Sequence, residues 1–210
     1  MESGMNSIMR VPDCGCVRNI QVYGLPDSIR RAKLPMSTNA DLLSDDITAG
    51  IQALAQSEAG GGHDQWLTGV VVQFDLTFSN KAWVEMERYH FVDFVSSQST
   101  MHRITKFDLD GQYNRYVDPE IVQIMKDKVA AYNQYKDEVT PEEAAEWYLE
   151  ILYSNPAGFR LTAGMTTNYR QLKTIYAQRK NHRLPEWREF CRFIETLPMS
   201  GLITKEETYV

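Results

Sequence analysis

The sequence predicts an α+β fold, organised as one domain spanning residues 1–210. Two observations carry this prediction: helical patterns interleave with only a few alternating strands, and the length is that of one large domain. A domain of this size buries roughly 70% of the surface of its unfolded chain, so its core needs neither disulfides nor metals. Hydrophobic residues make up 43% of the chain and charged residues 24%, which excludes the disordered and collagen-like classes.

Two segments alternate between apolar and more polar residues, which is typical of half-buried strands. The clearer one runs from Val70 to Phe78, and the second from Phe159 to Met165. The stretch after His90 is rich in Phe, Val and Ser and is interpreted as a strand or an extended loop. The first forty residues mix Pro, Gly and charges without a period, so they are predicted to be irregular.

Helices are predicted where apolar residues recur with helical spacing and where capping patterns precede them. Thr140-Pro141-Glu142-Glu143 has the pattern of a capping box, and Asp118-Pro119 that of a cap followed by an N1 proline. Asn80 is expected to cap another helix. The remaining predicted helices are Asp41 to Ala59, which Gly60-Gly61-Gly62 would end, Tyr169 to Arg179, and a last one from about Pro185.

Charge and cysteine content limit the classes of partner and the compartment. The formal net charge of −6 gives no overall attraction to nucleic acid or to an anionic membrane. No stretch approaches the roughly 20 apolar residues of a membrane span, and the N-terminus lacks a secretory pattern. The odd cysteine count (Cys14, Cys16, Cys191) favours the reducing cytoplasm. Cys14-x-Cys16 has no second pair, so no metal site is predicted.

Polar residues gather in two segments, of which the first covers residues 85–103. Arg88, His90, His102 and Arg103 surround a run of hydroxyl side chains. Such groups suit an anion, because arginine and serine donate hydrogen bonds to phosphate oxygens. The alternative interpretation is a helix C-terminus whose basic residues complement the helix dipole, followed by a serine-rich turn.

The second polar segment, residues 166–179, begins at the predicted end of a strand. Asn168 is placed to cap the helix that follows. Arg170 falls in the first turn, where a cation is electrostatically unfavourable, and this indicates an anion nearby. A plain capped helix ending near Arg179 is the alternative. The residues by themselves therefore lead to an anion-binding α+β domain.

The order and spacing of these segments resemble the flavin-dependent thymidylate synthases (ThyX). That family carries a Gly-His pair before a strand, an Arg-His-Arg triplet, a serine followed by x-Arg, and an Asn-x-Arg that opens a helix ending in Leu-Arg. The counterparts here are Gly62-His63, Arg88-Tyr89-His90, Ser99 with Met101, Asn168-Tyr169-Arg170, Arg179 and the later Trp187. The matching stretches cover about a third of the chain.

The resemblance implies a small, mostly antiparallel sheet packed by helices, assembled as a homotetramer. It also implies reductive methylation of dUMP, or of a related pyrimidine nucleotide, at C5. FAD would be the cofactor, with NADPH and methylenetetrahydrofolate as co-substrates. The family's chemistry requires no protein nucleophile, and none is assigned.

The same resemblance assigns the candidate site residues. FAD would be bound by His63, Arg88, Tyr89, His90, Asn168 and Arg170. The nucleotide would be bound by Glu85, Arg88, Ser99, Met101 and Arg179. Arg88 and Arg179 are the candidate catalytic residues, because an arginine against a uracil carbonyl stabilises the enolate charge that develops as C5 becomes nucleophilic.

Several positions depart from the family pattern, and most of these departures remove or oppose a positive charge. Tyr89-His90 stands where the family has His-Arg, Met101 replaces an arginine, and Glu85 replaces a glutamine. The loop to Ser99 is also one residue longer, and a family arginine expected before the second strand has no clear equivalent between Trp147 and Pro156. Loss of three charged contacts at about 1.5–3 kcal/mol each would weaken dUMP binding by several orders of magnitude. Arg103 or His102 is a candidate substitute.

Two other classes of function remain open. A non-catalytic flavin- or nucleotide-binding protein on the same fold is favoured by the altered triplet and by Glu85. A nucleic-acid-binding module would use a basic patch on and after the last-but-one helix, although the acidic net charge makes nucleic acid an unexpected partner. That patch would consist of Arg170, Lys173, Arg179, Lys180, His182 and Arg183.

Overall fold

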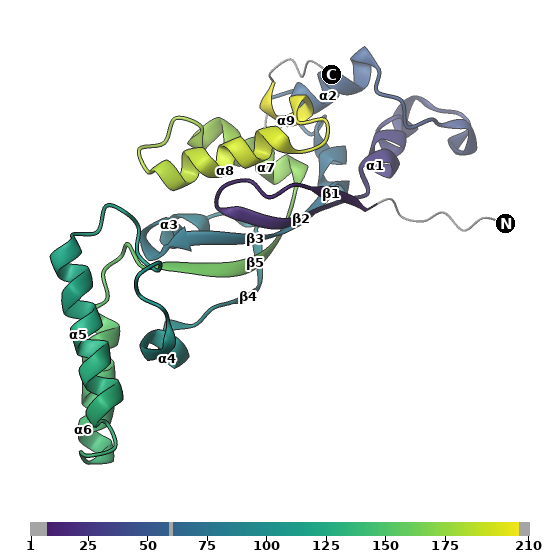
Figure 1. Ribbon diagram of the computed structural model, residues 1–210. Coiled ribbons are helices and arrows are strands. Elements are labelled where there is room, and N and C mark those ends of the chain that lie inside the picture. Colours follow the sequence, from purple (N-terminus) through teal and green to yellow (C-terminus); the bar gives the residue numbers. More distant parts are fainter. Residues whose placement is uncertain (1–7, 59–60, 206–210) are drawn as a thin grey trace. The chain divides into compact units, whose positions relative to one another are not determined.

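The computed structural model describes residues 8–58 and 61–205, which form two compact units (Figure 1). Each unit combines segments that lie far apart in the sequence. Unit 1 consists of Met1–Leu76, Glu87–Val95 and Gly164–Val210, and unit 2 of Thr77–Met86 and Ser96–Ala163.

The strands form one five-stranded sheet with the order β1-β2-β3-β5-β4. They are β1 (Met9–Val11), β2 (Val17–Tyr23), β3 (Val71–Ser79), β4 (Asp93–Ser97) and β5 (Arg160–Asn168). β2 pairs antiparallel with β1 and with β3. Gln73 of β3 forms a hydrogen bond with Thr166 of β5, and Thr77 forms one with Thr162. Residue numbers therefore rise along β3 as they fall along β5, so these two strands are antiparallel. The prediction of an α+β fold with a small antiparallel sheet is confirmed.

The N-terminal prediction is wrong for residues 8–40, which form β1, β2 and the helix α1 (Leu25–Ala32). A tight turn precedes β2, where Cys14 and Val17 exchange both backbone hydrogen bonds at 2.9 Å. The alternation of β2 is broken near Asn19, whose φ of 54° is left-handed and where the register with β3 shifts. An irregularity of this kind hides a strand from periodicity.

The other helices of unit 1 are α2 (Ala49–Gln56), α7 (Tyr169–Arg179), α8 (Pro185–Thr196) and α9 (Gly201–Thr204). The predicted start of the second helix at Asp41 is wrong, because Thr48 caps α2 by accepting a hydrogen bond from the Ile51 backbone N–H at 3.3 Å. The polar residues before Thr48 favour caps and turns over helix interiors. The predicted extension of this helix to Ala59 is also wrong, because α2 ends at Gln56 and the backbone N–H of Ser57 donates to the Leu54 oxygen at 3.3 Å. Ala59 and Gly60 themselves lie outside the described residues.

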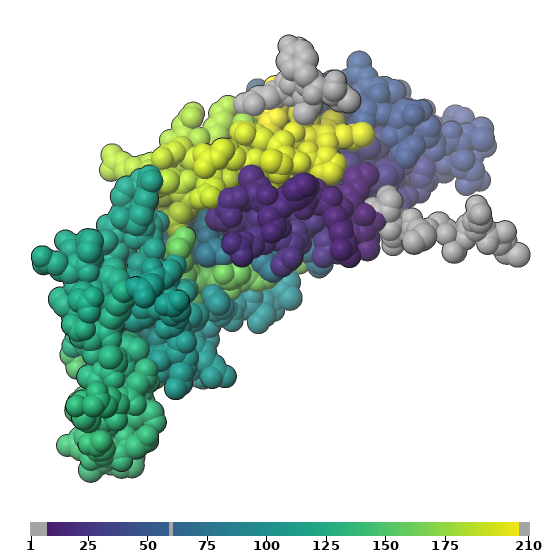
Figure 2. Space-filling view, viewed as in Figure 1, coloured from purple at the N-terminus to yellow at the C-terminus, as the bar shows by residue number. Residues whose placement is uncertain are grey.

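The core of unit 1 joins the sheet to the C-terminal helices. Phe74 of β3 packs against Phe190 and Phe193 of α8, with ring centroids 5.8 and 5.2 Å apart. The N-terminal strands (purple) and the C-terminal helices (yellow) lie side by side (Figure 2). At this junction Gly15 has a left-handed φ of +56°, which favours glycine, and it lies against the side chain of Glu189. α7 packs against both α8 and α9, which holds it firmly in the unit.

Unit 2 contains α3 (Asn80–Met86), α4 (Thr100–Arg103), α5 (Pro119–Tyr135) and α6 (Pro141–Ser154). The predicted caps of α5 and α6 are both present, including the reciprocal bonds of the capping box between Thr140 and Glu143. The predicted cap of α3 is wrong, because Asn80 is already helical and the Ser79 hydroxyl accepts from the Ala82 N–H at 3.4 Å. The core cluster comprises Ile104, Leu109, Met125, Val129, Ile151 and Phe159.

Candidate functional site

Helix α7 carries two of the predicted site arginines, one in its first turn and one at its last residue. Its bounds, Tyr169–Arg179, are those predicted. The helix begins there because Asn168 Oδ1 accepts a hydrogen bond from the Gln171 backbone N–H at 2.9 Å. Nine residues at 3.6 per turn place Arg170 and Arg179 on opposite sides of the helix, about 13 Å apart along its axis. The two arginines therefore occupy different environments.

At the start of α7, Arg170 binds the two residues that follow His63. Its Nε donates to Asp64 Oδ1 at 2.9 Å, and its Nη1 donates to Gln65 Oε1 at 2.7 Å. A cation in the first turn of a helix was expected to indicate an anion nearby, and the anion that the structure provides is the carboxylate of Asp64. His63 itself is exposed.

Lys173, one turn further along α7, is buried and uses all three of its ammonium protons. Its Nζ donates to Asp64 Oδ2 at 2.8 Å and to the backbone oxygens of Ala55 and Ser57 at 2.7 and 2.6 Å. Those two oxygens lie at the C-terminal end of α2, where a positive charge complements the helix dipole. Lys173 therefore ties α2 and the segment of Asp64 to α7.

The carboxylate of Asp64 is almost fully buried, with 2% of the residue exposed. Burial alone would raise the pKa of Asp64, but the hydrogen bonds and charges of Lys173 and Arg170 outweigh burial and hold this pKa below its usual value. Two cations thus face one carboxylate, and the cluster keeps a net positive charge. The Arg170 side chain is 32% exposed, so this charge reaches the surface.

At the end of α7, Arg179 is held by two aromatic side chains. Its guanidinium carbon lies 4.7 Å from the centre of the Trp187 ring and 5.6 Å from that of Tyr89. Its Nε donates to the Tyr89 hydroxyl at 2.8 Å, and this hydroxyl donates to Gln178 Oε1 at 2.9 Å. Trp187 is fully buried and meets the Tyr89 ring edge-on at 5.9 Å. Neither of these two aromatic side chains carries a charge.

The rest of the predicted triplet lies beside this aromatic cluster. Arg88 and His90 flank Tyr89 in the chain, and both side chains are exposed. All the predicted flavin-binding residues belong to unit 1, as does Arg179. The structure therefore brings Tyr89 together with Arg179, and it ties Arg170 to the segment of His63.

Three predicted nucleotide-binding residues belong to unit 2. Glu85 Oε1 lies 3.7 Å from the Nζ of Lys81, one turn earlier on α3. Ser99 is the residue before α4, and Met101 is an exposed residue within that helix. The roles of all three stay predictions.

Asp64, Gln65 and Gln178 were not singled out by sequence reasoning, and Trp187 was named only within the resemblance. One pattern could have pointed to Asp64: Lys173 lies between Leu172 and Ile175 on a helix whose apolar side is buried. A buried lysine requires an anionic partner, and Asp64 directly follows the Gly-His pair. The burial of Lys173 also removes it from the basic patch that a nucleic-acid-binding module would need.

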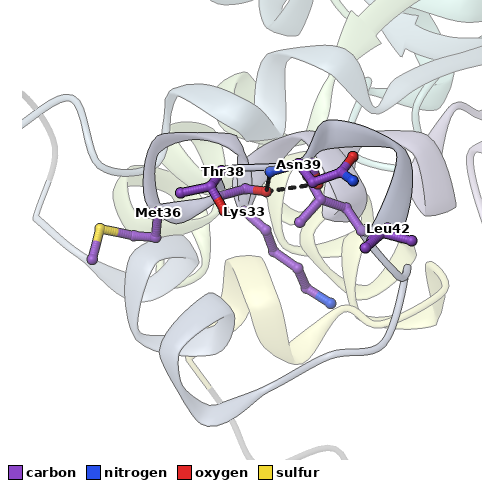
Figure 3. Close-up of a pocket in the computed structure, with 7 residues that line it drawn as sticks. Lys33, Met36, Thr38, Asn39 and Leu42 are labelled. Atoms are coloured by element: carbon purple, nitrogen blue, oxygen red, sulfur yellow. Dashed lines mark hydrogen bonds between the residues drawn. The ribbon is translucent and has the colours of Figure 1, made fainter.

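A surface pocket in unit 1 contains none of the predicted site residues (Figure 3). Its polar groups bond one another: the Ser37 hydroxyl donates to the Asn39 backbone oxygen at 2.8 Å and accepts from its N–H at 3.1 Å. Lys33 Nζ donates to the backbone oxygen and hydroxyl of Ser44. The pocket is lined by Lys33, Met36, Ser37, Thr38, Asn39, Leu42 and Leu43.

Two further kinds of feature are absent from the described ranges, 8–58 and 61–205. Within them, no group of His, Cys, Asp and Glu side chains is arranged to hold a metal ion, and no helix is long and apolar enough to cross a bilayer. Burial raises the pKa of Cys191 to about 12 and raises the pKa of Cys16 as well, so neither thiol is a nucleophile at neutral pH.

Solved structures of flavin-dependent thymidylate synthases share this architecture. ThyX from Helicobacter pylori, complexed with FAD and dUMP, is similar with a TM-score of 0.62 at 13% identity, over 94% of this chain and 98% of that chain. A second structure of H. pylori ThyX with FAD and dUMP gives 0.61 at 12% identity, over 86% and 93%. No established family profile and no curated protein matches the sequence. The chain therefore has a ThyX-like fold.

Proposed function

We propose that the protein is a flavin-dependent, ThyX-like methyltransferase that methylates dUMP, or a related pyrimidine nucleotide, at C5. The observation that carries the proposal is the likeness to H. pylori ThyX, which extends over nearly the whole length of both chains. The two arginines of α7 add support, because each is held in place by neighbouring side chains. The proposed cofactor is FAD, and the proposed co-substrates are NADPH and methylenetetrahydrofolate.

The residues at the start of α7 fit a flavin cofactor. The net positive cluster around Asp64 suits a diphosphate, because Arg170 keeps an uncompensated charge that reaches the surface. Asn168 uses its carbonyl oxygen for the helix cap, so its amide nitrogen is the atom that would contact the cofactor. His63, Arg88 and His90 would complete the proposed cofactor site. When bound, FAD would take hydride from NADPH and supply it to the carbon that the folate has transferred.

The proposed nucleotide site uses Arg179 and Arg88, both of unit 1. Arg179 would donate hydrogen bonds to a uracil carbonyl and stabilise the enolate charge that develops when C5 attacks the methylene carbon. Arg88 would donate to the phosphate. The bond between this carbon and the folate nitrogen would break and release tetrahydrofolate, the C5 proton would be lost, and a hydride supplied through FAD would reduce the transferred carbon to a methyl group.

We further propose that the protein acts as a homotetramer. Arg170 and Arg179 lie on opposite sides of α7 and have different neighbours. FAD at Arg170 and the nucleotide at Arg179 must adjoin to react, and this is most simply achieved when two copies of the chain each contribute one end of α7 to a shared site. Light scattering coupled to size-exclusion chromatography tests this proposal, and a monomer at all concentrations would contradict it.

Turnover is the direct test of the proposed function. Protein incubated with FAD, NADPH, methylenetetrahydrofolate and dUMP is expected to form dTMP, detected by mass spectrometry. Arg179→Ala is expected to abolish the product, while Arg183→Ala, an exposed arginine beyond the helix, retains it. Formation of no dTMP by the wild-type protein would overturn the proposed activity.

The alternative is a non-catalytic flavin- or nucleotide-binding homologue, and one observation favours it. The side chain of Glu85 is only 18% exposed and is held beside Lys81, so a carboxylate occupies the position of a family glutamine. A charge there would repel a phosphate or a uracil carbonyl. Binding of FAD and dUMP without any dTMP would support this alternative.

A substitution at Met101 tests whether the departures from the ThyX family pattern weaken nucleotide binding. Met101→Arg restores the family's cation and is expected to tighten dUMP binding about tenfold or more, as a charged hydrogen bond should. Met101→Gln is the matched control, because it adds length and polarity without charge. Isothermal titration calorimetry measures both, and equal affinities for the two variants would contradict the assigned role of this position.

A further inference from the structure

Helix α5 of unit 2 carries two adjacent rows of residues at the spacing of a coiled coil, with alternating steps of three and four. In the first row, Met125 and Val129 are buried in the core of unit 2, and Tyr132 packs against that core. The second row lies one residue earlier at each step. We call this second row the α5 seam, and it consists of Ile121, Ile124, Lys128, Ala131 and Tyr135.

The described residues leave the apolar side chains of the α5 seam largely uncovered. Ile121, Ile124 and Tyr135 are 43, 52 and 42% exposed, and Ala131 is exposed as well. A single exposed hydrophobic residue is ordinary on a protein surface. The seam instead repeats such residues at heptad spacing over about 21 Å of helix, which is the pattern by which one helix packs on another.

The neighbouring helix α6 lies beside α5 (Figure 1). The two helices run antiparallel, because Lys128 pairs with Glu150 while the Tyr132 and Tyr148 rings meet with centroids 5.4 Å apart. Lys128 is the one charged residue of the α5 seam, and Glu150 compensates its charge. The seam therefore carries no unpaired charge.

Aromatic side chains of α6 continue the apolar strip beyond the α5 seam. Trp147 and Tyr153 each lie three residues from Glu150, so they project from the side of α6 that adjoins Lys128 and the seam. Both are exposed, Tyr153 to 88%. Together the two helices present one apolar surface with a single ion pair near its middle.

We propose that this surface binds the same surface of a second copy of the chain, so that two hairpins of α5 and α6 form a four-helix bundle. Charge favours this occupant. A two-fold axis brings two pairs of Lys128 and Glu150 together, and each lysine then lies near a glutamate of either copy. A partner with a strong charge of one sign would instead oppose one member of the pair.

This inference goes beyond the proposed function, because α5 and α6 contain none of the proposed cofactor or nucleotide residues. A tetramer with dihedral symmetry needs two kinds of interface. The α5 seam supplies one that is separate from the shared ligand site at α7.

Adjacent alanines of α5 provide a matched pair of variants. Ala131→Glu adds a carboxylate to the α5 seam, where Lys128 is already paired with Glu150 and no cation is left for it. Ala130→Glu is the control, because Ala130 is also exposed but is turned about 100° away around the helix. Both variants add the same charge and volume to the same helix.

Sedimentation velocity and equilibrium measure the effect on the full-length protein. The wild type is expected to self-associate, and Ala131→Glu is expected to sediment with half the wild-type mass. Its dissociation constant should rise about a hundredfold, because the two-fold axis places a loss of about tenfold on each of two copies. Ala130→Glu should keep the mass and the dissociation constant of the wild type.

A second pair of variants tests the apolar contact without adding charge. Ile124→Ser removes an apolar side chain from the α5 seam, and Gln123→Ser changes the adjacent exposed residue. Ile124→Ser should weaken self-association, and Gln123→Ser should not. This pair decides the question if Ala131→Glu loses helical circular dichroism.

The remaining outcomes would overturn the inference. They are a monomeric wild type, the wild-type mass retained in the seam variants, and equal losses in the seam variants and their controls. Titration with FAD separates this result from the proposed function. A wild-type protein that associates through the α5 seam but binds no FAD would contradict the proposed function and leave the interface in place.

Discussion

The two ends of helix α7 hold an arginine in opposite ways. Arg170 is anchored by the buried carboxylate of Asp64, which it shares with Lys173. Arg179 is held by the face of Trp187 and the neutral hydroxyl of Tyr89. The first arrangement joins α2, the segment of Asp64 and α7 through charge, and the second places a cation against two aromatic rings and a hydroxyl.

This difference predicts which property each cluster controls. A buried ion pair left without one partner is strongly destabilising, because the remaining charge is buried and uncompensated. The loss of a hydroxyl from a partly exposed tyrosine removes one hydrogen bond and leaves the packing intact. Substitutions around Arg170 should therefore change stability first, and substitutions around Arg179 should change ligand binding first.

The largest effect is expected from Asp64→Asn, which leaves Lys173 buried without an anion. The free energy of unfolding should fall by about 3 kcal/mol or more, measured by urea denaturation at pH 7. Asp27→Asn is the control, because Asp27 pairs with Arg30 at 3.2 Å on the surface. That exposed pair should contribute less than about 1 kcal/mol, so similar losses in the two variants would remove the distinction between the clusters.

The same carboxylate should give the stability a pH dependence. The pKa of Asp64 is lowered in the folded protein from an ordinary value of 3.8, so the unfolded chain takes up its proton first as the pH falls. The stabilisation is complete above pH 3.8 and is lost as the pH falls through the lower folded value. Urea denaturation between pH 6 and pH 2 should show a steeper loss for the wild type than for Asp64→Asn; parallel curves would contradict the ion-pair account.

A smaller effect is expected at Asn168, the cap of α7. Two substitutions there distinguish a role in stability from a role in FAD binding. Asn168→Ala removes the cap and should cost about 1 kcal/mol of stability. Asn168→Asp keeps a capping oxygen and should keep the stability, but it replaces the amide donor with a negative charge beside Arg170. FAD titration should therefore show weaker binding by Asn168→Asp than by the wild type. Unchanged FAD affinity would leave Asn168 as a cap alone.

Local patterns predicted those parts of the fold that depend on neighbouring residues. The bounds of α7 follow from a cap at Asn168 and a helical apolar period, and the alternation between Val70 and Phe78 predicts β3 to within one residue at each end. β2 was missed because its register shifts near Asn19.

The contacts around the two arginines depend on residues distant in the chain. Asp64 and Lys173 are 109 positions apart, and Tyr89 and Arg179 are 90 apart. The resemblance marked Arg170 and Arg179 as site residues, but no pattern in one sequence reports that one would bind a carboxylate and the other a phenol. Those partners are set by the packing of α7 within unit 1.

The most direct test of the central claim, that this chain is a ThyX-like flavoprotein with a nucleotide site, is its visible absorption spectrum on titration with FAD and then with dUMP. The account predicts that the oxidised flavin bands appear with the protein after removal of free FAD, and that dUMP perturbs them. A protein that retains no flavin, with or without dUMP, would contradict the claim and leave only the fold in common with ThyX.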